Sequence, residues 1–235
     1  MDIKITDSLV TEFLQDHYRP LNRNLEKLRE ISRADKVPLI RRETEMLLNT
    51  LLDLKQPRKI LEIGTAIGYS AVYFATSCPH AEVYTIEKDE YMFRAARINV
   101  RQSRLENQIH VLHGDGAEVL DLLRGNGIHD FDLVFIDAAK SHYQEFMEHA
   151  LTVCRDGALI ICDDILQNGL TLIDADMDPK RERKHRTNIR QMRAFVDWIT
   201  SDPRLSTSLN AVGDGMSLSV YHGSEEQPEG IHAVR

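Results

Sequence analysis

Residues 62–70 read Glu-Ile-Gly-Thr-Ala-Ile-Gly-Tyr-Ser and follow a short apolar run that begins at Lys59. The glycines Gly64 and Gly68 suit a tight turn between a strand and a helix, where a ligand can approach the backbone closely. The turn lacks the second glycine of the G-x-G-x-x-G pattern, which normally lets a pyrophosphate approach the helix. The stretch therefore predicts a strand, a turn and a helix that bind a ligand without phosphates.

Four more short apolar runs follow, with amphipathic helical segments between them, at residues 81–87, 109–115, 131–137 and 158–164. This alternation is typical of a parallel sheet whose right-handed crossovers bring the carboxyl ends of all strands to one edge. After a charged helix that ends near Ile199, residues 206–212 and 216–222 flank Gly-Asp-Gly and predict a hairpin. The predicted fold is a Rossmann-like, doubly wound α/β fold with a mostly parallel seven-stranded sheet and an antiparallel C-terminal hairpin.

The chain divides into three predicted parts. Residues 1–56 form an N-terminal helical extension with helices over 9–18, over 21–34 and from Pro38, which fits the first turn of the third helix. Residues 57–222 form the ligand-binding domain, and residues 223–235 form a tail that frays.

Composition excludes several classes of protein. With 42% hydrophobic and 28% charged residues over 235 positions, the chain is typical of a globular protein, and no apolar run is long enough to cross a membrane. We therefore expect a cytoplasmic location. Cys78, Cys154 and Cys162 are too scattered for a disulfide framework or a zinc site. The net charge of −8 argues against general binding of polyanions.

Acidic residues end the second and third predicted strands. Glu87 can accept hydrogen bonds from both hydroxyls of a ribose, and Asp115, beside Gly116, is placed near an adenine ring. The alternative is that Gly64 and Gly68 only shape a turn and that Glu87 caps a helix. The glycine turn after the first predicted strand and the acids at the ends of the second and third together favour an adenosine-binding site.

These motifs resemble the class I S-adenosylmethionine-dependent methyltransferases, and the resemblance runs from about Pro38 to His222. It extends to the metal-dependent O-methyltransferases that act on catechols and caffeoyl-coenzyme A, and it is closest to bacterial tRNA 5-hydroxyuridine methyltransferases. Three stretches carry it: 55–71, 109–115 and 134–144. The resemblance implies a homodimer, N-terminal helices that close over the cofactor, and these cofactor contacts: Ile40, Glu62, Gly64, Gly68, Ser70, Glu87, Asp115, Gly116 and Asp137.

Three carboxylates end the fourth and fifth predicted strands. Asp137, Asp163 and Asp164 offer only oxygen ligands, which suit Mg²⁺ or another hard divalent cation. The alternative is that these acids cap helices. Related enzymes carry Asp-Asn where this chain has Asp163-Asp164, and the additional negative charge leaves the metal preference open.

Lys140 lies three residues after Asp137, and the resemblance places a lysine here near the acceptor hydroxyl. A divalent cation would lower the pKa of this lysine and allow it to act as a general base. The hypothesis for the mechanism assigns catalysis to Lys140 and Asp137: Mg²⁺ holds two adjacent oxygens of the acceptor, and one oxyanion attacks the sulfonium methyl. The alternative for Lys140 is an exposed charge at the rim.

Residues 180–193 contain seven Lys or Arg and one acid, which predicts a local basic surface. The resemblance implies that the acceptor is 5-hydroxyuridine at the wobble position of a tRNA anticodon, converted to 5-methoxyuridine. The expected RNA contacts are Lys180, Arg181, Arg183, Lys184 and Arg186.

Other readings stay open. The basic run can be a solvated helix face, and the acceptor can be a small catechol-like or phenylpropanoid molecule. A non-catalytic module that binds S-adenosylmethionine, or an NAD-binding domain, would belong to a different functional class.

Overall fold

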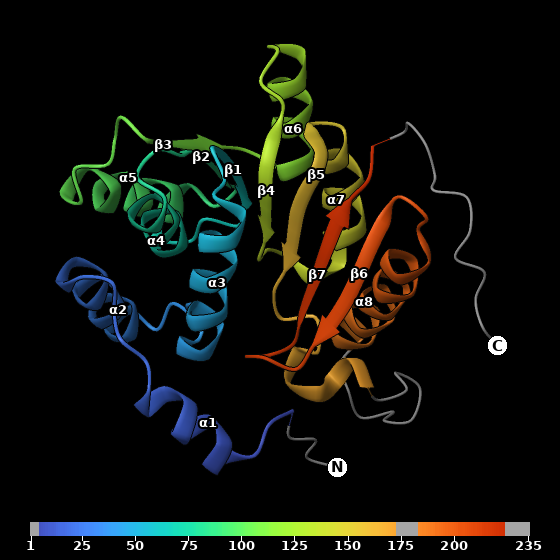
Figure 1. The fold of residues 1–235 in the computed structure, drawn as a ribbon, viewed down its shortest axis with the longest axis horizontal. Coiled ribbons are helices and arrows are strands. Elements are labelled where there is room, and N and C mark those ends of the chain that lie inside the picture. Colours follow the sequence, from blue (N-terminus) through green and yellow to red (C-terminus); the bar gives the residue numbers. More distant parts are fainter. Residues whose placement is uncertain (1–4, 173–182, 224–235) are drawn as a thin grey trace.

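The computed structural model describes residues 5–172 and 183–223 and is built around one seven-stranded sheet of order β3-β2-β1-β4-β5-β7-β6 (Figure 1). The strands β1 to β5 pair in parallel, whereas β7 is antiparallel to both β5 and β6. The predicted fold class is confirmed. The strands are β1 (Lys59–Ile63), β2 (Glu82–Glu87), β3 (Ile109–His113), β4 (Phe131–Ile136), β5 (Cys154–Cys162), β6 (Leu205–Asn210) and β7 (Met216–Tyr221).

Helices cover both faces of the sheet, so two apolar clusters form, one on each side. On one face lie α2 (Arg23–Asp35), α3 (Arg42–Lys55), α4 (Tyr69–Ser77) and α5 (Glu90–Gln102). On the other lie α6 (Gly116–Gly125), α7 (Tyr143–Leu151) and α8 (Arg183–Ser201). All six residues of β4 are buried, as expected for a central parallel strand that is apolar on both faces.

The strand order reverses between β1 and β4, because β1 is followed outward by β2 and β3 and β4 is followed by β5 on the other side. In open α/β sheets this switch point leaves a crevice outside the carboxyl ends of the neighbouring strands. The turns after β1, β2, β4 and β5 therefore meet at one place, where the candidate site lies.

The third N-terminal helix begins later than predicted. Pro38 was expected in its first turn, but α3 begins at Arg42, and the capping residue Arg41 has an extended backbone with φ −72° and ψ 158°. The expectation was wrong because residues 37–41 form an extended segment between α2 and α3. This segment turns out to form one wall of the candidate site.

The first helix, α1 (Ser8–Asp16), packs loosely. None of its residues, all within the described part, is buried, and Leu9, Val10 and Phe13 expose apolar side chains. Within the described residues no helix is long and apolar enough to cross a membrane. Cys78, Cys154 and Cys162 are free thiols.

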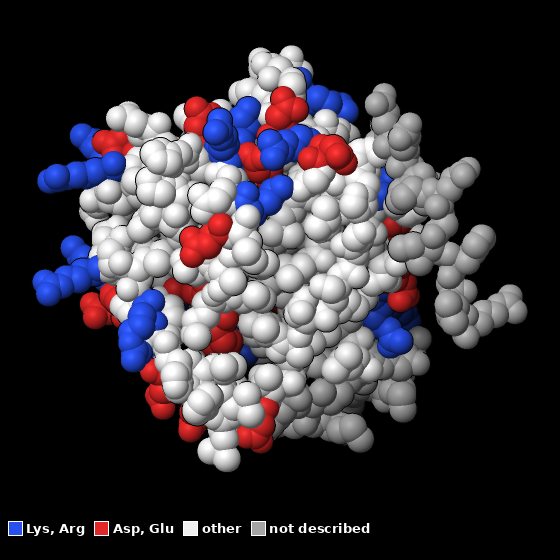
Figure 2. Space-filling model, in the orientation of Figure 1, with Lys and Arg blue, Asp and Glu red and all other residues white. Residues whose placement is uncertain are grey.

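Parts of the expected basic surface and tail fall outside the described residues. Lys180, Arg181 and residues 224–235 lie there, and the side chains of Arg183 and Lys184 are not described either. Arg186 is described and half-buried. On the face shown in Figure 2, the Lys and Arg side chains of the described residues intermingle with Asp and Glu.

Candidate active site

A cavity of about 610 Å³ opens at the carboxyl ends of β1, β2, β4 and β5. Other parts of the chain complete its walls: the segment before α3, the first turn of α4, the start of α6, Phe146 of α7, Asn168 after β5, and Asp214 in the turn between β6 and β7. Of the predicted cofactor contacts, seven line this cavity: Ile40, Gly64, Ser70, Glu87, Asp115, Gly116 and Asp137.

The turn after β1 packs directly on the end of β4. Gly64 has φ +100°, and a β-carbon there would lie 2.0 Å from the carbonyl oxygen of Asp137. Only glycine permits both the backbone angle and this approach. The amide of Asp137 also donates to Ile63 O at 3.0 Å. The turn that is predicted to bind the cofactor and the strand end that carries Asp137, a predicted catalytic residue, are thus parts of one rigid unit.

Glu87 is held in place by two backbone donors. Its Oε2 accepts from Ala66 N and its Oε1 from Asp89 N, each at 2.8 Å. A carboxylate oxygen has more than one lone pair, so each oxygen can still accept from a ligand hydroxyl. The geometry suits the predicted recognition of a ribose.

Two predicted cofactor contacts lie behind the cavity wall and are not among its lining residues. Gly68 precedes α4 with φ +84°, and a β-carbon there would be 3.2 Å from Ala96 of α5, so this glycine serves helix packing. Glu62 is fully buried within β1 and accepts a hydrogen bond from Thr85. Strand alternation explains the second case, because Glu62 points into the protein.

Burial raises the pKa of Glu62 to about 7, although hydrogen bonds from Ser70 and Thr85 lower it and the charge of Asp137 raises it further. Ser70 itself lines the cavity. Glu62 therefore contacts Ser70, which lines the cavity, but does not line the cavity itself.

The side chain of Asp115 is engaged in contacts within the protein. Its Oδ1 accepts from Ala117 N at 3.1 Å and caps α6, while its Oδ2 pairs with Lys88 Nζ at 2.9 Å. The hydrogen bond from Lys88 lowers the pKa of Asp115. The residue still borders the cavity, as does Gly116, where a β-carbon would be 2.7 Å from the ring of Phe146.

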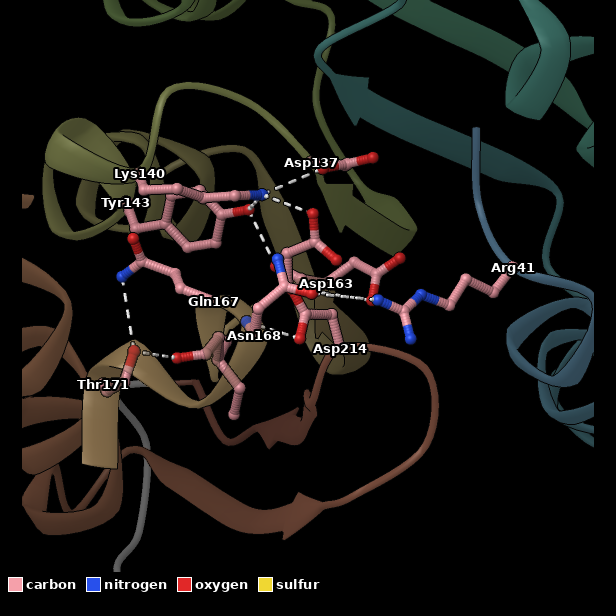
Figure 3. Close-up of polar contacts among 11 residues, drawn as sticks. Arg41, Asp137, Lys140, Tyr143, Asp163, Gln167, Asn168, Thr171 and Asp214 are labelled. Carbon is pink, nitrogen blue, oxygen red and sulfur yellow. Dashed lines mark hydrogen bonds and ion pairs between the residues drawn. The ribbon is translucent and has the colours of Figure 1, made fainter. Parts of the chain in front are cut away.

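The opposite end of the cavity is acidic and contains one central ammonium group (Figure 3). Asp137, Asp163 and Asp164 all line it. Lys140 Nζ lies 3.0 Å from Asp137 Oδ1 and 3.4 Å from Asp164 Oδ2. It also donates to the hydroxyl of Tyr143 at 2.7 Å. The side chain of Lys140 is only 19% exposed, so this charge is held close to the carboxylates.

The charges at this end of the cavity shift the pKa values of Asp163 and Lys140. Burial, together with the charges of Asp137 and Asp164, raises the pKa of Asp163 to about 8. Burial alone would lower the pKa of Lys140, but Tyr143, Asp137 and Asp164 outweigh it and raise the value. The predicted lowering of this pKa by a bound divalent cation stays a prediction. Lys140 is an ammonium group here.

The three acids have the oxygen donors that suit a hard cation, and their mutual repulsion would be relieved by one. Their positions do not form a ready site, however. Within residues 5–172 and 183–223, no group of three or more His, Cys, Asp or Glu side chains is arranged to hold a metal ion. The ammonium of Lys140 lies between two of the three carboxylates.

Several cavity residues were not predicted. Asp214, only 4% exposed, accepts from Asn168 N at 2.6 Å. Arg41 reaches across the mouth and donates to Gly213 O at 3.3 Å and to Asn168 Oδ1 at 3.4 Å. The Gly-Asp-Gly turn was recognised as a turn, but its place beside the carboxyl end of β5 depends on the pairing of β5 with β7. No local signal in the sequence marks that contact.

Comparison with known proteins gives the family. A model of the O-methyltransferase family matches residues 16–221. The chain belongs to the O-methyltransferase family. Among curated relatives, this O-methyltransferase is 32% identical over 178 residues to a catechol O-methyltransferase of Niastella koreensis, covering 74% of this chain and 77% of that protein. It is 29% identical to a caffeoyl-CoA O-methyltransferase of Populus kitakamiensis, covering 73% of each.

Solved structures agree with this family. The O-methyltransferase superposes on a candidate caffeoyl-CoA O-methyltransferase from Staphylococcus aureus with a TM-score of 0.83 and 30% identity, covering 91% of this chain and 100% of that one. An O-methyltransferase from Bacillus cereus, in complex with SAH, matches with a TM-score of 0.79 and 26% identity, covering 91% and 97%.

Proposed function

We propose that this O-methyltransferase transfers a methyl group from S-adenosylmethionine to one of two adjacent hydroxyls of a small, catechol-like acceptor. The observation that carries the proposal is the ammonium of Lys140, held between Asp137 and Asp164 in the same cavity as Glu87. The curated relatives named for catechol and caffeoyl-CoA support a small acceptor.

The cofactor is proposed to extend along the cavity from Glu87 to Asp137. Glu87 accepts hydrogen bonds from the ribose, and Ser70 and Asp137 face the amino-acid portion, which carries the sulfonium. The packing of Gly64 on Asp137 fixes the distance between these two regions. The relative with bound SAH supports a sulfur-containing adenosyl ligand in this fold.

The acceptor hydroxyl is proposed to lie against Lys140. The ammonium donates a hydrogen bond to the acceptor oxygen and stabilises the negative charge that develops as the proton leaves toward the carboxylate of Asp137. The oxygen then forms a bond to the methyl carbon while the carbon–sulfur bond breaks, which leaves S-adenosylhomocysteine and the methyl ether. Alignment of the oxygen, carbon and sulfur supplies much of the acceleration.

A divalent cation stays a proposal, with Asp137, Asp163 and Asp164 as the residues that would hold it. When bound, it would act as a Lewis acid toward acceptor oxygens. The carboxylates and Lys140 would first have to separate, because the ammonium lies 3.0 Å from Asp137.

The alternative acceptor, 5-hydroxyuridine in the tRNA anticodon, rests on sequence. Seven Lys or Arg lie in residues 180–193, and unstacked RNA bases with basic contacts to the backbone would suit such a surface. The described residues add no contact that favours it over a small acceptor. A homodimer likewise stays a proposal, supported by the apolar side chains that α1 exposes.

The test incubates purified protein with labelled S-adenosylmethionine. Parallel reactions contain catechol, tRNA with 5-hydroxyuridine, or the same tRNA with uridine. Label in catechol supports the proposal. Label only in the hydroxylated tRNA moves the function to RNA. A melting temperature raised by S-adenosylmethionine but not by NAD separates a methyltransferase from a dinucleotide-binding protein.

A further inference from the structure

The wall of the cavity formed by residues 37–41 is fastened to the N-terminal helices at several points. Ile40, which is 4% exposed, lines the cavity, as do Pro38, Leu39 and Arg41. At the start of the segment, Ser32 Oγ donates to Val37 O at 2.5 Å, and Val37 N donates to Ser32 O at 2.9 Å. The segment has no strand or helix of its own, so these contacts determine where it lies.

The contact nearest the cavity comes from a buried arginine of α2. Arg29 Nη2 donates to the carbonyl oxygen of Ile40 at 3.1 Å and to the hydroxyl of Tyr69 at 3.0 Å. It also forms an ion pair with Glu45 of α3. Arg29 is 8% exposed and Glu45 is 1% exposed. One guanidinium thus joins the cavity wall, α3 and the first turn of α4.

Two aromatic hydroxyls complete the surroundings of the carboxylate. Tyr69, which lines the cavity, donates to Glu45 Oε1 at 2.7 Å, and Tyr18 donates to Glu45 Oε2. The guanidinium of Arg29 also stacks on the ring of Tyr69, 4.8 Å from its centroid. Tyr73 donates to the backbone carbonyl of Glu45 at 2.8 Å.

A buried ion pair is an expensive way to stabilise a fold, because both charges lose their hydration and an apolar pair of similar size often serves as well. A planar guanidinium offers something that an apolar pair lacks, since its donors point in fixed directions. Here Arg29 Nη2 donates to the carbonyl oxygen of Ile40, while the carboxylate of Glu45 holds the guanidinium in place. The arrangement controls the position of a backbone atom at the cavity.

We propose that Arg29, oriented by Glu45, is a positioning residue that holds the Ile40 wall against the cofactor. The N-terminal helices are then part of the cofactor site, although Arg29 does not line the cavity. The inference rests on the proposed binding of S-adenosylmethionine in that cavity. Because the wall contacts the cofactor in the same way before and during methyl transfer, its displacement weakens binding without altering the chemical step.

The test replaces both charged groups at once, with Arg29→Met and Glu45→Gln in one protein. This double variant leaves no unpaired buried charge, and the amide introduced by Glu45→Gln can accept from one of the two tyrosine hydroxyls through its oxygen and donate to the other through its nitrogen. We expect KM for S-adenosylmethionine to rise about tenfold with kcat within about twofold, and the dissociation constant measured by calorimetry to rise in parallel. Tyr18→Phe is the matched control, because it removes a hydrogen bond to the same carboxylate but leaves the contact of Arg29 with Ile40.

Four outcomes are distinguished by these measurements. A folded double variant with unchanged KM overturns it, as does a Tyr18→Phe protein whose KM rises equally, since the network would then act only through stability. If the double variant does not fold, Arg29→Lys takes its place: the shorter lysine side chain cannot bring its nitrogen to the position of Arg29 Nη2, which contacts Glu45, Tyr69 and Ile40 O, so KM must still rise. Wild-type protein that does not bind S-adenosylmethionine contradicts the proposed function instead.

Discussion

Gly64 lies so close to Asp137 that a β-carbon on the glycine would be 2.0 Å from the aspartate's carbonyl oxygen. The contact joins the turn after β1, which faces the adenosine end of the proposed cofactor, to the strand end that carries the acidic group. Neither element can shift without the other. The proposed methyl donor and the proposed catalytic groups are therefore kept in register by backbone packing.

Gly64→Ala should destabilise the protein strongly. The substitution combines a positive φ, which costs a residue other than glycine roughly 1–2 kcal/mol, with a backbone clash that costs about as much again. Gly127→Ala is the matched control, because Gly127 has φ +73° but nothing within 4 Å of its β-carbon position. Urea unfolding should show the larger loss at Gly64, and equal losses would mean that the clash relaxes freely.

Glu87→Gln should weaken the binding of S-adenosylmethionine about tenfold, because a charged acceptor of the ribose hydroxyls becomes a neutral one. The amide oxygen can still accept from Ala66 N, so the turn after β1 should keep its shape, although Asp89 N then loses its side-chain acceptor. Glu82→Gln, at the exposed beginning of the same strand, should bind like the wild type. Calorimetric titration measures both, and an unchanged affinity in the Glu87 variant would place the ribose elsewhere.

Lys140→Met should lower kcat about 100-fold with a smaller change in KM for the cofactor, since it removes the donor to the developing oxyanion. Lys140→Arg restores a positive charge in a different shape and should recover part of the rate. Steady-state kinetics with a catechol acceptor provides the measurement. Full activity in the methionine variant would exclude Lys140 from the chemistry.

Glu62 should make stability depend on pH. Its folded pKa of about 7 lies above its ordinary value of 4.5, because burial disfavours the charged carboxylate. Its stabilising contribution is therefore complete below pH 4.5 and is lost as pH rises through 7. The loss amounts to roughly 3 kcal/mol.

Urea unfolding between pH 5 and pH 8 checks this expectation. Glu62→Gln should make the decline of the unfolding free energy over this range shallower, although the raised pKa of Asp163 preserves part of it, whereas the exposed Glu106→Gln should leave the slope unchanged. A wild-type slope that survives in the Glu62 variant would assign the titration to another group.

Metal removal tests the proposed cation separately from catalysis. Protein treated with EDTA and then titrated with Mg²⁺ should gain melting temperature, because a ligand at 100 times its dissociation constant stabilises the fold by about 2.7 kcal/mol. Asp163→Asn should lose that gain. If Mg²⁺ leaves the melting temperature of the wild type unchanged, the three acids do not form a metal site.

The sequence was most informative where one local rule controls the structure. Short apolar runs separated by helices predict the parallel strands, and an acid at a strand end, such as Glu87, must lie at the carboxyl edge of the sheet. Glu62 is buried within β1 and does not line the cavity, so its predicted contact with the cofactor stays a prediction.

The remaining features depend on contacts between distant parts of the chain. Arg29 and Glu45 are ordinary charged residues of amphipathic helices until the packing of α2 and α3 on α4 buries them together. The pKa of Lys140 is raised mainly by Tyr143 and Asp137, which are near in sequence, but Asp164, on a different strand end, also raises it. Pro38 fits a helix start locally, but the path from α2 to α3 keeps its segment extended.

The most direct test of the proposed function compares initial rates of methyl transfer to catechol and to resorcinol, its isomer with non-adjacent hydroxyls, at saturating S-adenosylmethionine. The two acceptors have the same size and charge, so the ratio of rates reports on the pair of adjacent oxygens alone. We predict methylation of catechol at a rate at least tenfold above that of resorcinol. Equal rates, or no methylation of either acceptor by protein that binds the cofactor, would contradict the proposal.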